Sequence, residues 1–327
     1  MRCGIIGFGK MGRIRAEAIE QCGGTIERVY EKKCSTGIYK NAENENEIWN
    51  DNNIDCVFIC TPNAFNFPYT IKSLQAGKHV FCEKPPCFTP EEMKVIQQEE
   101  IKSGKKLMYG FNHRHHESIQ YMKKLIDSNE YGKVLWIRGR YGKSVDDDFF
   151  KSWRASKELA GAGILMDQGI HMVDLFLHLS GDFDVVKSIV SNNYWNIDGL
   201  EDNVFAILAN SETGVSAQLH STMTDWRFIF SLEVFLSSGY IVLNGLKTST
   251  GKYGKEMLSI AKNRTSAPQA AFSEEINITY DIDNSWKNEI STFFECINNN
   301  SPITNGSSSD ALSLMKIIDE IYKNCLK

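Results

Sequence analysis

Hydrophobic residues in the first third of the chain gather in short continuous runs, and segments with helical spacing separate these runs. The runs lie at residues 3–6, 55–60, 78–82 and 106–111, and a further run ends at Glu31. A continuous apolar run between polar residues is typical of a strand that is buried on both faces of a parallel sheet. Helical segments lie at 14–21, at 67–76 and after Thr89. This alternation predicts a doubly wound parallel sheet.

From about Gly132 the pattern changes to short runs with partial alternation, which is typical of antiparallel strands. These runs lie at residues 134–141, 185–194, 203–209, 215–222, 228–236 and 240–243. A long helix is predicted at 163–179, and amphipathic helices are predicted at 285–298 and 309–325. The polar segment 247–271 is predicted to be an excursion from the sheet.

The chain has 327 residues, which is more than one hydrophobic core comfortably holds. We therefore expect two domains, and the predicted fold class is α/β plus α+β. An N-terminal domain at 1–120 would hold the doubly wound parallel sheet. A C-terminal domain at 121–327 would hold a large open antiparallel sheet.

Charge and cysteine content limit which class of partner we expect the protein to bind and in which compartment we expect it to work. The formal net charge of −5 gives no electrostatic footprint for nucleic acid or an anionic membrane, so we expect a small-molecule partner. The 9 cysteines are dispersed and lie partly inside apolar runs, which indicates a reducing compartment. No run approaches the ~18 apolar residues of a membrane span, and the first residues enter a strand without a signal peptide. We therefore predict a cytoplasmic protein.

The first loop carries Gly7-Phe8-Gly9-Lys10-Met11-Gly12 between a predicted strand and a predicted helix. This spacing fits a dinucleotide-binding fingerprint, in which the glycines allow a tight turn, a close approach to pyrophosphate and helix-to-strand packing. The helix N-terminus offers N–H groups and a positive dipole end to the phosphates. Glu31, at the end of the next run, can accept hydrogen bonds from a ribose. An ordinary glycine turn is the alternative.

Two further motifs follow predicted parallel strands. Thr61-Pro62-Asn63 comes after the run at 55–60, and Glu83-Lys84-Pro85 comes after the run at 78–82. The carboxyl ends of parallel strands are where α/β proteins bind ligands, so both motifs are expected at one site. Lys84 can hydrogen-bond a reacting oxygen, and the following prolines stiffen its turn. A solvated surface lysine is the alternative.

The predicted helix at 163–179 carries Asp167, His171 and Asp174 at helical spacing, which places them on one face. A histidine titrates near neutrality and can take a proton from a hydroxyl group. Asp167 can bind substrate hydroxyls or assist the proton relay, whereas we expect a structural role for Asp174. The alternative is a partly buried helix whose histidine is satisfied by a carboxylate.

Histidines also cluster in Asn112-His113-Arg114-His115-His116. Their spacing suits neither a tetrahedral zinc site nor a helical pair of ligands, so no metal is predicted. Asp146-Asp147-Asp148 is predicted to be a solvated turn, because a calcium loop needs further oxygen ligands at regular spacing.

The glycine loop, the motifs at 61–63 and 83–85, and Asp167-Gln168-Gly169-Ile170-His171 are specific in their order and spacing. With them the chain resembles the glucose–fructose oxidoreductase/inositol dehydrogenase/rhizopine-catabolism (Gfo/Idh/MocA) family of NAD(P)-dependent oxidoreductases. The resemblance spans nearly the whole chain. It implies a Rossmann domain followed by an open antiparallel sheet, through which we expect a homodimer or homotetramer.

The resemblance also implies roles for individual residues. The catalytic residues would be Lys84, Asp167 and His171, and Arg114 would join these three in binding substrate. The resemblance places Asn112 and Arg114 at the cleft and brings Trp153 and Arg154 to the cofactor. The predicted cofactor-binding residues are Gly7, Phe8, Gly9, Lys10, Met11, Gly12, Glu31, Thr61, Pro62, Asn63, Glu83, Lys84, Asn112, Trp153 and Arg154.

The implied activity is hydride transfer between a nicotinamide cofactor and a secondary alcohol or ketone of a sugar, nucleotide-sugar or cyclitol. One alternative is an NAD-dependent glycosidase that oxidises its substrate transiently before elimination. The other is a cofactor-binding sensor without chemistry. A sensor needs only the glycines and Glu31, so the presence of Lys84, Asp167 and His171 argues against it.

The sequence departs from the family pattern at two places, so the family's substrate pocket carries over to this chain less directly. Asn66 stands where the family often carries histidine, and Gly161-Ala162-Gly163 replaces an unbroken glycine run.

The sequence gives opposing signals on the choice between NAD and NADP. Glu31 favours NAD, while Lys32 and Lys33 could pair with the 2′-phosphate of NADP. Since the carboxylate is at the strand end and the lysines follow on a loop, NAD is predicted to be preferred, with NADP possible.

Overall fold

The computed structural model describes residues 1–32, 36–262 and 274–326. Within these ranges the chain forms two compact units, and each is assembled from separate stretches of sequence. The first unit comprises Met1–Asn112, Glu158–Gly161 and Ser285–Lys316. The second unit comprises the described residues of His113–Lys157, Ala162–Asn284 and Ile317–Lys327.

The described part of the first unit contains a five-stranded parallel sheet in the order β2-β1-β3-β4-β5. The strands are β1 (Arg2–Ile6), β2 (Thr25–Tyr30), β3 (Cys56–Ile59), β4 (His79–Glu83) and β5 (Leu107–Gly110). Every residue of β3 and β5 is buried, as expected where helices cover both faces of the sheet. The predicted doubly wound parallel sheet is therefore confirmed.

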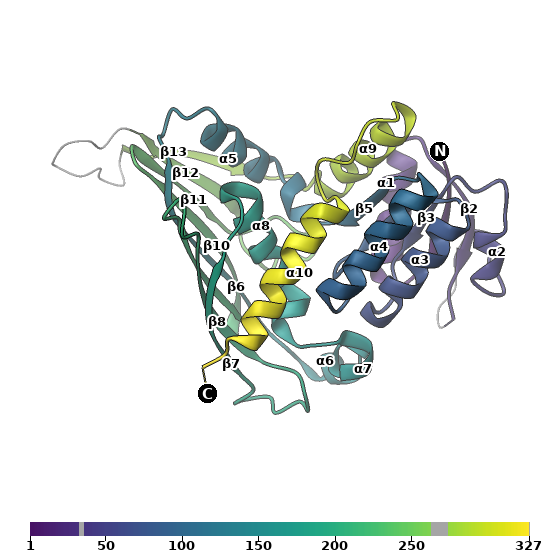
Figure 1. Cartoon of the computed structure of the whole chain (residues 1–327), viewed down its shortest axis with the longest axis horizontal. Coiled ribbons are helices and arrows are strands. Elements are labelled where there is room, and N and C mark those ends of the chain that lie inside the picture. Colours follow the sequence, from purple (N-terminus) through teal and green to yellow (C-terminus); the bar gives the residue numbers. More distant parts are fainter. Residues whose placement is uncertain (33–35, 263–273, 327) are drawn as a thin grey trace. The chain divides into compact units, whose positions relative to one another are not determined.

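Helices cover this sheet on two faces (Figure 1). Helices α3 and α4 pack side by side on one face, and α1 packs against α9. The rings of Phe58, Phe81 and Phe293 meet in the core between the sheet and α9. The helices of this unit are α1 (Lys10–Gln21), α2 (Asn46–Trp49), η1 (Asn63–Phe65), α3 (Asn66–Gln75), α4 (Pro90–Ser103) and α9 (Ser285–Asn298).

Local sequence explains the clean start and end of α4. The Thr89 hydroxyl accepts the N–H of Glu92, and the Glu92 carboxylate accepts the N–H of Thr89, which together form a capping box. Pro90 fits the first turn because its missing N–H has no partner there. Gly104 ends the helix with φ of 65°, a left-handed conformation that glycine adopts without steric cost.

The described residues of the second unit form an eight-stranded sheet in the order β13-β12-β11-β10-β6-β9-β8-β7. All neighbouring strands are antiparallel except β6 and β9, so the sheet is mixed and mostly antiparallel. Its strands are β6 (Val134–Ser144), β7 (Val185–Ser191), β8 (Asn203–Ala209), β9 (Ser216–Thr222), β10 (Thr224–Leu236), β11 (Gly239–Asn244), β12 (Glu256–Lys262) and β13 (Ile276–Tyr280).

Strand β12 corrects the prediction of a polar excursion at 247–271. Polar Glu256 and Ser259 are buried in this strand, so its interior positions do not stand out as apolar in the sequence. Residues 263–271 of the predicted excursion lie outside the described residues.

Helices α5 and α8 lie over one face of this sheet (Figure 1). Gly139 of β6 allows the close approach, because a Cβ there would lie 2.4 Å from Met172 and 2.7 Å from Phe176 of α8. The remaining helical segments are η2 (Asn112–His115), α5 (Glu117–Asp127), α6 (Asp147–Phe150), η3 (Trp153–Ala155), α7 (Lys157–Ala160), η4 (Leu165–Gly169), α8 (Ile170–Ser180) and α10 (Ser308–Lys323).

The long helix predicted at 163–179 has an irregular first part. Residues Leu165–Gly169 form a π-helical turn, η4, and the regular helix α8 starts only at Ile170. A π-turn inside a helix is rare and is frequently found at functional sites.

A buried arginine links three elements of the first unit. The Arg15 Nε atom of α1 lies 2.6 Å from a Glu83 carboxylate oxygen at the end of β4. Its Nη1 atom lies 2.5 Å from a Glu289 oxygen of α9. The guanidinium also stacks over the rings of Phe81 and Trp286. Burial alone would lower the pKa of Arg15, but the charges of Glu289 and Glu83 outweigh this effect and raise it.

We predict that Arg15→Leu destabilises the first unit by about 3–5 kcal/mol, because two buried carboxylates would lose their shared cation. The deficit should shrink as the pH falls, since protonation removes the uncompensated negative charge. Chemical denaturation followed at pH 7 and pH 5 measures both effects.

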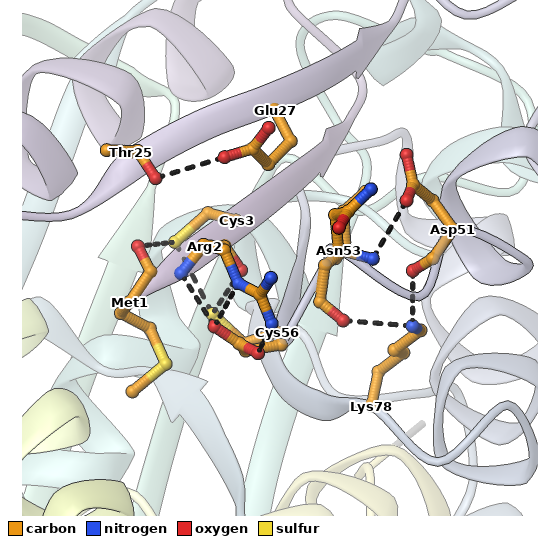
Figure 2. Close-up of polar contacts among 11 residues, drawn as sticks. Met1, Arg2, Cys3, Thr25, Glu27, Asp51, Asn53, Cys56 and Lys78 are labelled. Carbon is orange, nitrogen blue, oxygen red and sulfur yellow. Dashed lines mark hydrogen bonds and ion pairs between the residues drawn. The ribbon is translucent and has the colours of Figure 1, made fainter.

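Arg2→Leu is the matched control, because Arg2 of β1 (Figure 2) forms an ion pair with Asp55 in which much of both side chains is exposed. Exposed pairs contribute little to stability, so this variant should unfold almost like the wild type. An Arg15→Leu protein as stable as Arg2→Leu would contradict the role given to the buried network.

Candidate active site

The glycine loop lies at the point where the parallel sheet changes direction. The chain moves from β1 to β2 on one side and then crosses to β3 on the other side of β1. The loop Gly7–Gly12 follows β1, and Thr61-Pro62-Asn63 follows β3. Ligands of open α/β sheets bind at such a switch point, beyond the carboxyl ends of the strands.

Each glycine of the loop occupies a different environment. Gly7 has φ of +90°, and a Cβ there would lie 2.5 Å from the Cys60 carbonyl oxygen. A Cβ on Gly12 would lie 2.1 Å from the Gly7 carbonyl oxygen, so only glycine lets α1 pack this close. A Cβ on Gly9, in contrast, would meet no atom within 4 Å. The loop is therefore tight on its protein side and open at Gly9.

The Phe8 side chain is buried in the core of the first unit, where its ring contacts Tyr39 edge to face. Its main-chain N–H donates to a Glu31 carboxylate oxygen at 2.7 Å. Glu31 thus lies against the glycine loop, at the end of β2. Lys10 is exposed and Met11 is half-buried at the start of α1.

Of the two lysines after Glu31, Lys33 lies outside the described residues. The Lys32 ammonium lies 5.8 Å from the centre of the Tyr30 ring. A hydrogen bond to the Tyr30 hydroxyl raises the pKa of Lys32, so this lysine is engaged with its neighbour on β2.

Asn63 is buried, and its amide nitrogen donates to the Ala160 carbonyl oxygen at 2.9 Å. Asn112 is also buried, and its amide nitrogen lies 3.4 Å from the Ser285 hydroxyl. Both side chains therefore connect the sheet edge to the two later segments of the first unit. Thr61 and Pro62 are half-buried.

The turn Glu83-Lys84-Pro85 is held from two sides. The Glu83 carboxylate binds Arg15 at 2.6 Å. The Asn66 amide nitrogen donates to the Glu83 carbonyl at 3.1 Å and to the Pro85 carbonyl at 2.7 Å. Lys84 itself is half-buried between these fixed peptide groups.

In the second unit, Asp167 lies in the π-turn η4 and binds two cations. One carboxylate oxygen lies 2.6 Å from the Lys143 ammonium, and the other lies 3.2 Å from the Arg154 Nε atom. Arg154 also lies over the Trp153 ring at 4.4 Å. Asp167 is therefore an anchored hydrogen-bond acceptor, and the Trp153-Arg154 segment contacts this aspartate.

His171 is buried in the first turn of α8, where its ring stacks on that of His113. The ring centres lie 4.0 Å apart with an angle of 20° between the planes. His113 Nε2 lies 3.2 Å from the Tyr141 hydroxyl of β6. Burial raises the pKa of Tyr141, and burial likewise raises the pKa of the adjacent Tyr253 to about 12, so both phenols are neutral at pH 7.

Arg114 and Asp174 form a buried two-point ion pair, with distances of 2.8 and 2.6 Å between donor nitrogens and carboxylate oxygens. Arg114 is 3% exposed and Asp174 is 0% exposed. The pair joins η2 to α8, which agrees with a structural role for Asp174. The same pair occupies two nitrogens of Arg114, which the family resemblance assigns to substrate binding.

The histidines after Asn112 point to different partners. His113 stacks on His171, whereas His116 Nδ1 lies 3.1 Å from a buried Glu256 oxygen. Burial would raise the pKa of Glu256, but hydrogen bonds from His116 and Ser118 outweigh burial and lower it. Across the described residues, no group of three or more His, Cys, Asp or Glu side chains could hold a metal ion.

Sequence reasoning missed Lys143, His113 as the partner of His171, and Glu201. The Glu201 carboxylate accepts the N–H groups of Gly163 and Leu165 at 2.8 and 2.9 Å and thereby caps the start of the π-turn. A Cβ on Gly163 would lie 2.0 Å from the Glu201 carbonyl oxygen, so the glycine was a signal for this close approach. No local pattern marks Glu201 itself.

The described residues contain no helix that is long and apolar enough to cross a membrane.

The structure of the glycine loop fits a dinucleotide. Gly9 leaves space beside the backbone, the N-terminus of α1 follows at Lys10, and a carboxylate lies at the end of β2.

Comparison with known proteins gives two family matches. The model for "Oxidoreductase family, NAD-binding Rossmann fold" matches residues 1–111. The model for "GFO/IDH/MocA C-terminal domain" matches residues 119–242. Together they span well over half of the chain.

Individual relatives are sugar and cyclitol enzymes. The chain is 34% identical over 145 residues to D-glucoside 3-dehydrogenase of Escherichia coli, a match that covers 44% of this chain but only 40% of that relative. It is 25% identical to myo-inositol 2-dehydrogenase of Thermotoga maritima over 76% of this chain and 77% of the relative. A third relative, 26% identical over 60% of this chain and 50% of its own length, is 2,7-anhydro-N-acetylneuraminate hydratase of Escherichia coli.

The fold of the whole chain also has solved counterparts. A levoglucosan dehydrogenase in complex with NADH and levoglucosan superposes with a TM-score of 0.85 and covers 99% of this chain and 96% of its own, at 21% identity. The parallel sheet, the large second sheet and both family matches agree with one another. The chain therefore belongs to the GFO/IDH/MocA family of oxidoreductases.

Proposed function

We propose that this protein is an NAD-dependent dehydrogenase or reductase that acts on a secondary alcohol or ketone of a sugar, nucleotide-sugar or cyclitol. The observation that carries the proposal is the glycine loop, open at Gly9 and bordered by Glu31. The loop supports a dinucleotide site in the first unit. In the second unit, Asp167, held by Lys143 and Arg154, and His171, stacked on His113, support a substrate site. The named relatives support the substrate class.

The cofactor would be held by the Gly7–Gly12 loop, by Glu31 at the ribose, and by the 61–63 and 83–85 motifs. When bound, NAD supplies the acceptor for a hydride from the carbon that carries the alcohol. Asn112 supports this site through its buried contact with Ser285. We propose that Trp153 and Arg154 contribute through Asp167, since Arg154 is bound to that carboxylate.

In the oxidation direction, His171 accepts the hydroxyl proton as the carbonyl forms. The Lys84 ammonium stabilises the negative charge that develops on the same oxygen. Asp167, fixed by Lys143 and Arg154, accepts hydrogen bonds from neighbouring hydroxyl groups of the polyol. Arg114 serves the substrate indirectly, because its ion pair with Asp174 holds the helix that carries His171.

The hydratase relative favours a second candidate function. A hydration has no net change of oxidation state, so a cofactor used in it must be returned to its starting form. The two candidates are distinguished by a screen of sugars, nucleotide-sugars and inositols with stoichiometric NAD. A dehydrogenase accumulates NADH with ketone, whereas transient oxidation releases or adds water or an alcohol without a lasting change in nicotinamide absorbance.

We further propose that the protein is a homodimer or homotetramer in the cytoplasm. The sheet face away from α8 carries exposed Ile189, Phe205 and Ile207 on the paired strands β7 and β8. An exposed apolar patch of this kind supports association of two copies.

The cytoplasmic location is supported by the cysteines. The described cysteines are free thiols, as expected in a reducing compartment.

We predict that Gly9→Val abolishes NAD binding without unfolding the protein, because the new side chain would fill only the space that the pyrophosphate needs. Gly12→Ala should instead destabilise the fold, since its Cβ would lie 2.1 Å from the Gly7 carbonyl oxygen. Calorimetric titration with NAD and thermal unfolding of both variants measure the difference. Wild-type affinity in a folded Gly9→Val protein would contradict the glycine-loop assignment.

Lys84→Ala and His171→Ala should each lower kcat by about 10²–10⁴-fold while NAD still binds, because each removes a group that assists proton or charge transfer. The histidine variant should also lose one limb of the wild-type pH–rate profile, because the proton acceptor is removed. Lys94→Ala, a change of an exposed lysine on α4, is the control and should leave kcat unchanged. Near wild-type kcat in both test variants would refute the catalytic roles.

We predict that kcat/KM is about tenfold or more higher with NAD than with NADP. The 2′-phosphate of NADP would lie against Glu31. Leaving this carboxylate without its hydrogen bonds to the ribose would cost about 1–3 kcal/mol of binding free energy. Glu31→Ala should lower the ratio of kcat/KM with NAD to kcat/KM with NADP. Glu27→Ala removes the same charge from β2, the strand that Glu31 follows, and should leave the ratio unchanged. Equal or better use of NADP by the wild type would show that Glu31 does not govern the choice.

A further inference from the structure

Asn66, the first residue of α3, is completely buried and connects two of the motifs that follow parallel strands. Its carbonyl oxygen lies 3.4 Å from the Thr61 hydroxyl, in the loop after β3. Its amide nitrogen faces the turn after β4. One uncharged side chain therefore contacts both loops at the carboxyl edge of the sheet.

The amide nitrogen makes two hydrogen bonds, to the Glu83 carbonyl at 3.1 Å and to the Pro85 carbonyl at 2.7 Å. A primary amide has two hydrogens on nitrogen, so each carbonyl receives its own donor. The two carbonyls belong to the residues on either side of Lys84. Asn66 thus fixes the main chain before and after this lysine.

The Glu83 side chain adds a third restraint, because Arg15 binds its carboxylate at 2.6 Å. The main chain at Lys84 is therefore held by Asn66, and the preceding side chain is held by a buried cation. With its backbone fixed, the lysine can move its ammonium only by rotation about its own side-chain bonds.

We propose that Asn66 is a positioning residue for Lys84, and that its amide sets where the ammonium meets the substrate oxygen. This inference rests on the proposed function. Displacing a reacting group by about 1 Å can cost about 10²-fold in rate, so a turn held this firmly has a direct catalytic consequence.

Aspartate, histidine and serine do not reproduce the contact. An aspartate of the same size has no N–H donor when ionised, and a neutral histidine has only one. A serine can donate one hydrogen bond at most. The series Asn66→Ser, Asn66→Ala and Asn66→Asp therefore removes the two donors stepwise and then opposes the carbonyls with negative charge.

We expect Asn66→Ala and Asn66→Asp to lower kcat by about 10²-fold, with the dissociation constant for NAD within about threefold of wild type. The kcat of Asn66→Ser should lie between theirs and that of the wild type. This variant still tests the proposal if the other two do not fold. Ser73→Ala is the control on the same helix. It removes the buried hydrogen bond from Trp49 Nε1 to Ser73 Oγ, so it should lower the Tm but not kcat.

A double-mutant cycle with Lys84→Ala separates positioning from general stability. If Asn66 acts through Lys84, the Asn66→Ala/Lys84→Ala enzyme should be no slower than Lys84→Ala alone. Independent effects that multiply, or a loss of kcat in Asn66→Ala no larger than in Ser73→Ala, would overturn the proposal.

A measurement without turnover distinguishes this inference from the proposed function. Reductive methylation followed by peptide mass spectrometry gives the labelling rate of Lys84, which should change by about threefold or more in Asn66→Ala because the turn is released. A changed labelling rate with wild-type turnover in Lys84→Ala would leave the positioning intact and refute the catalytic role. An unchanged labelling rate with an inactive Lys84→Ala enzyme would refute the positioning alone.

Discussion

The buried contact of Arg15 with Glu83 and Glu289 is the constraint on which the first unit depends. It joins α1, the end of β4 and α9, which come from distant parts of the chain. Because an unpaired charge in the interior is costly, none of these elements can move away without a large loss of stability. The helix that follows the glycine loop is thereby fixed to the turn that carries Lys84.

Much of the first unit could be predicted because its signals are local. Continuous apolar runs marked the parallel strands, the glycine spacing marked the first turn, and 285–298 was predicted with the bounds that α9 has. The second unit was harder, because β12 buries polar residues and its neighbours alternate only partly. Antiparallel pairing was right for every neighbouring pair except β6 and β9, whose parallel register depends on strand order and not on local pattern.

The candidate site was predictable in its residue types but not in its contacts. Asp167 and His171 were found from helical spacing, yet the π-turn changes the local geometry between them. Their partners Lys143 and His113 lie on other elements, and no local motif records a contact across the fold. The same holds for Asn66, whose departure from the family pattern was visible while its two carbonyl partners were not.

The central claim is that a hydride passes from a sugar carbon to nicotinamide and stays there. Incubating the protein and NAD with a substrate deuterated at the reacting carbon tests it most directly, with the cofactor analysed by mass spectrometry and proton NMR. The account predicts one deuterium at nicotinamide C4 for each ketone formed. Product formed with no deuterium retained in the reduced cofactor, or with the deuterium returned to the sugar, would contradict it.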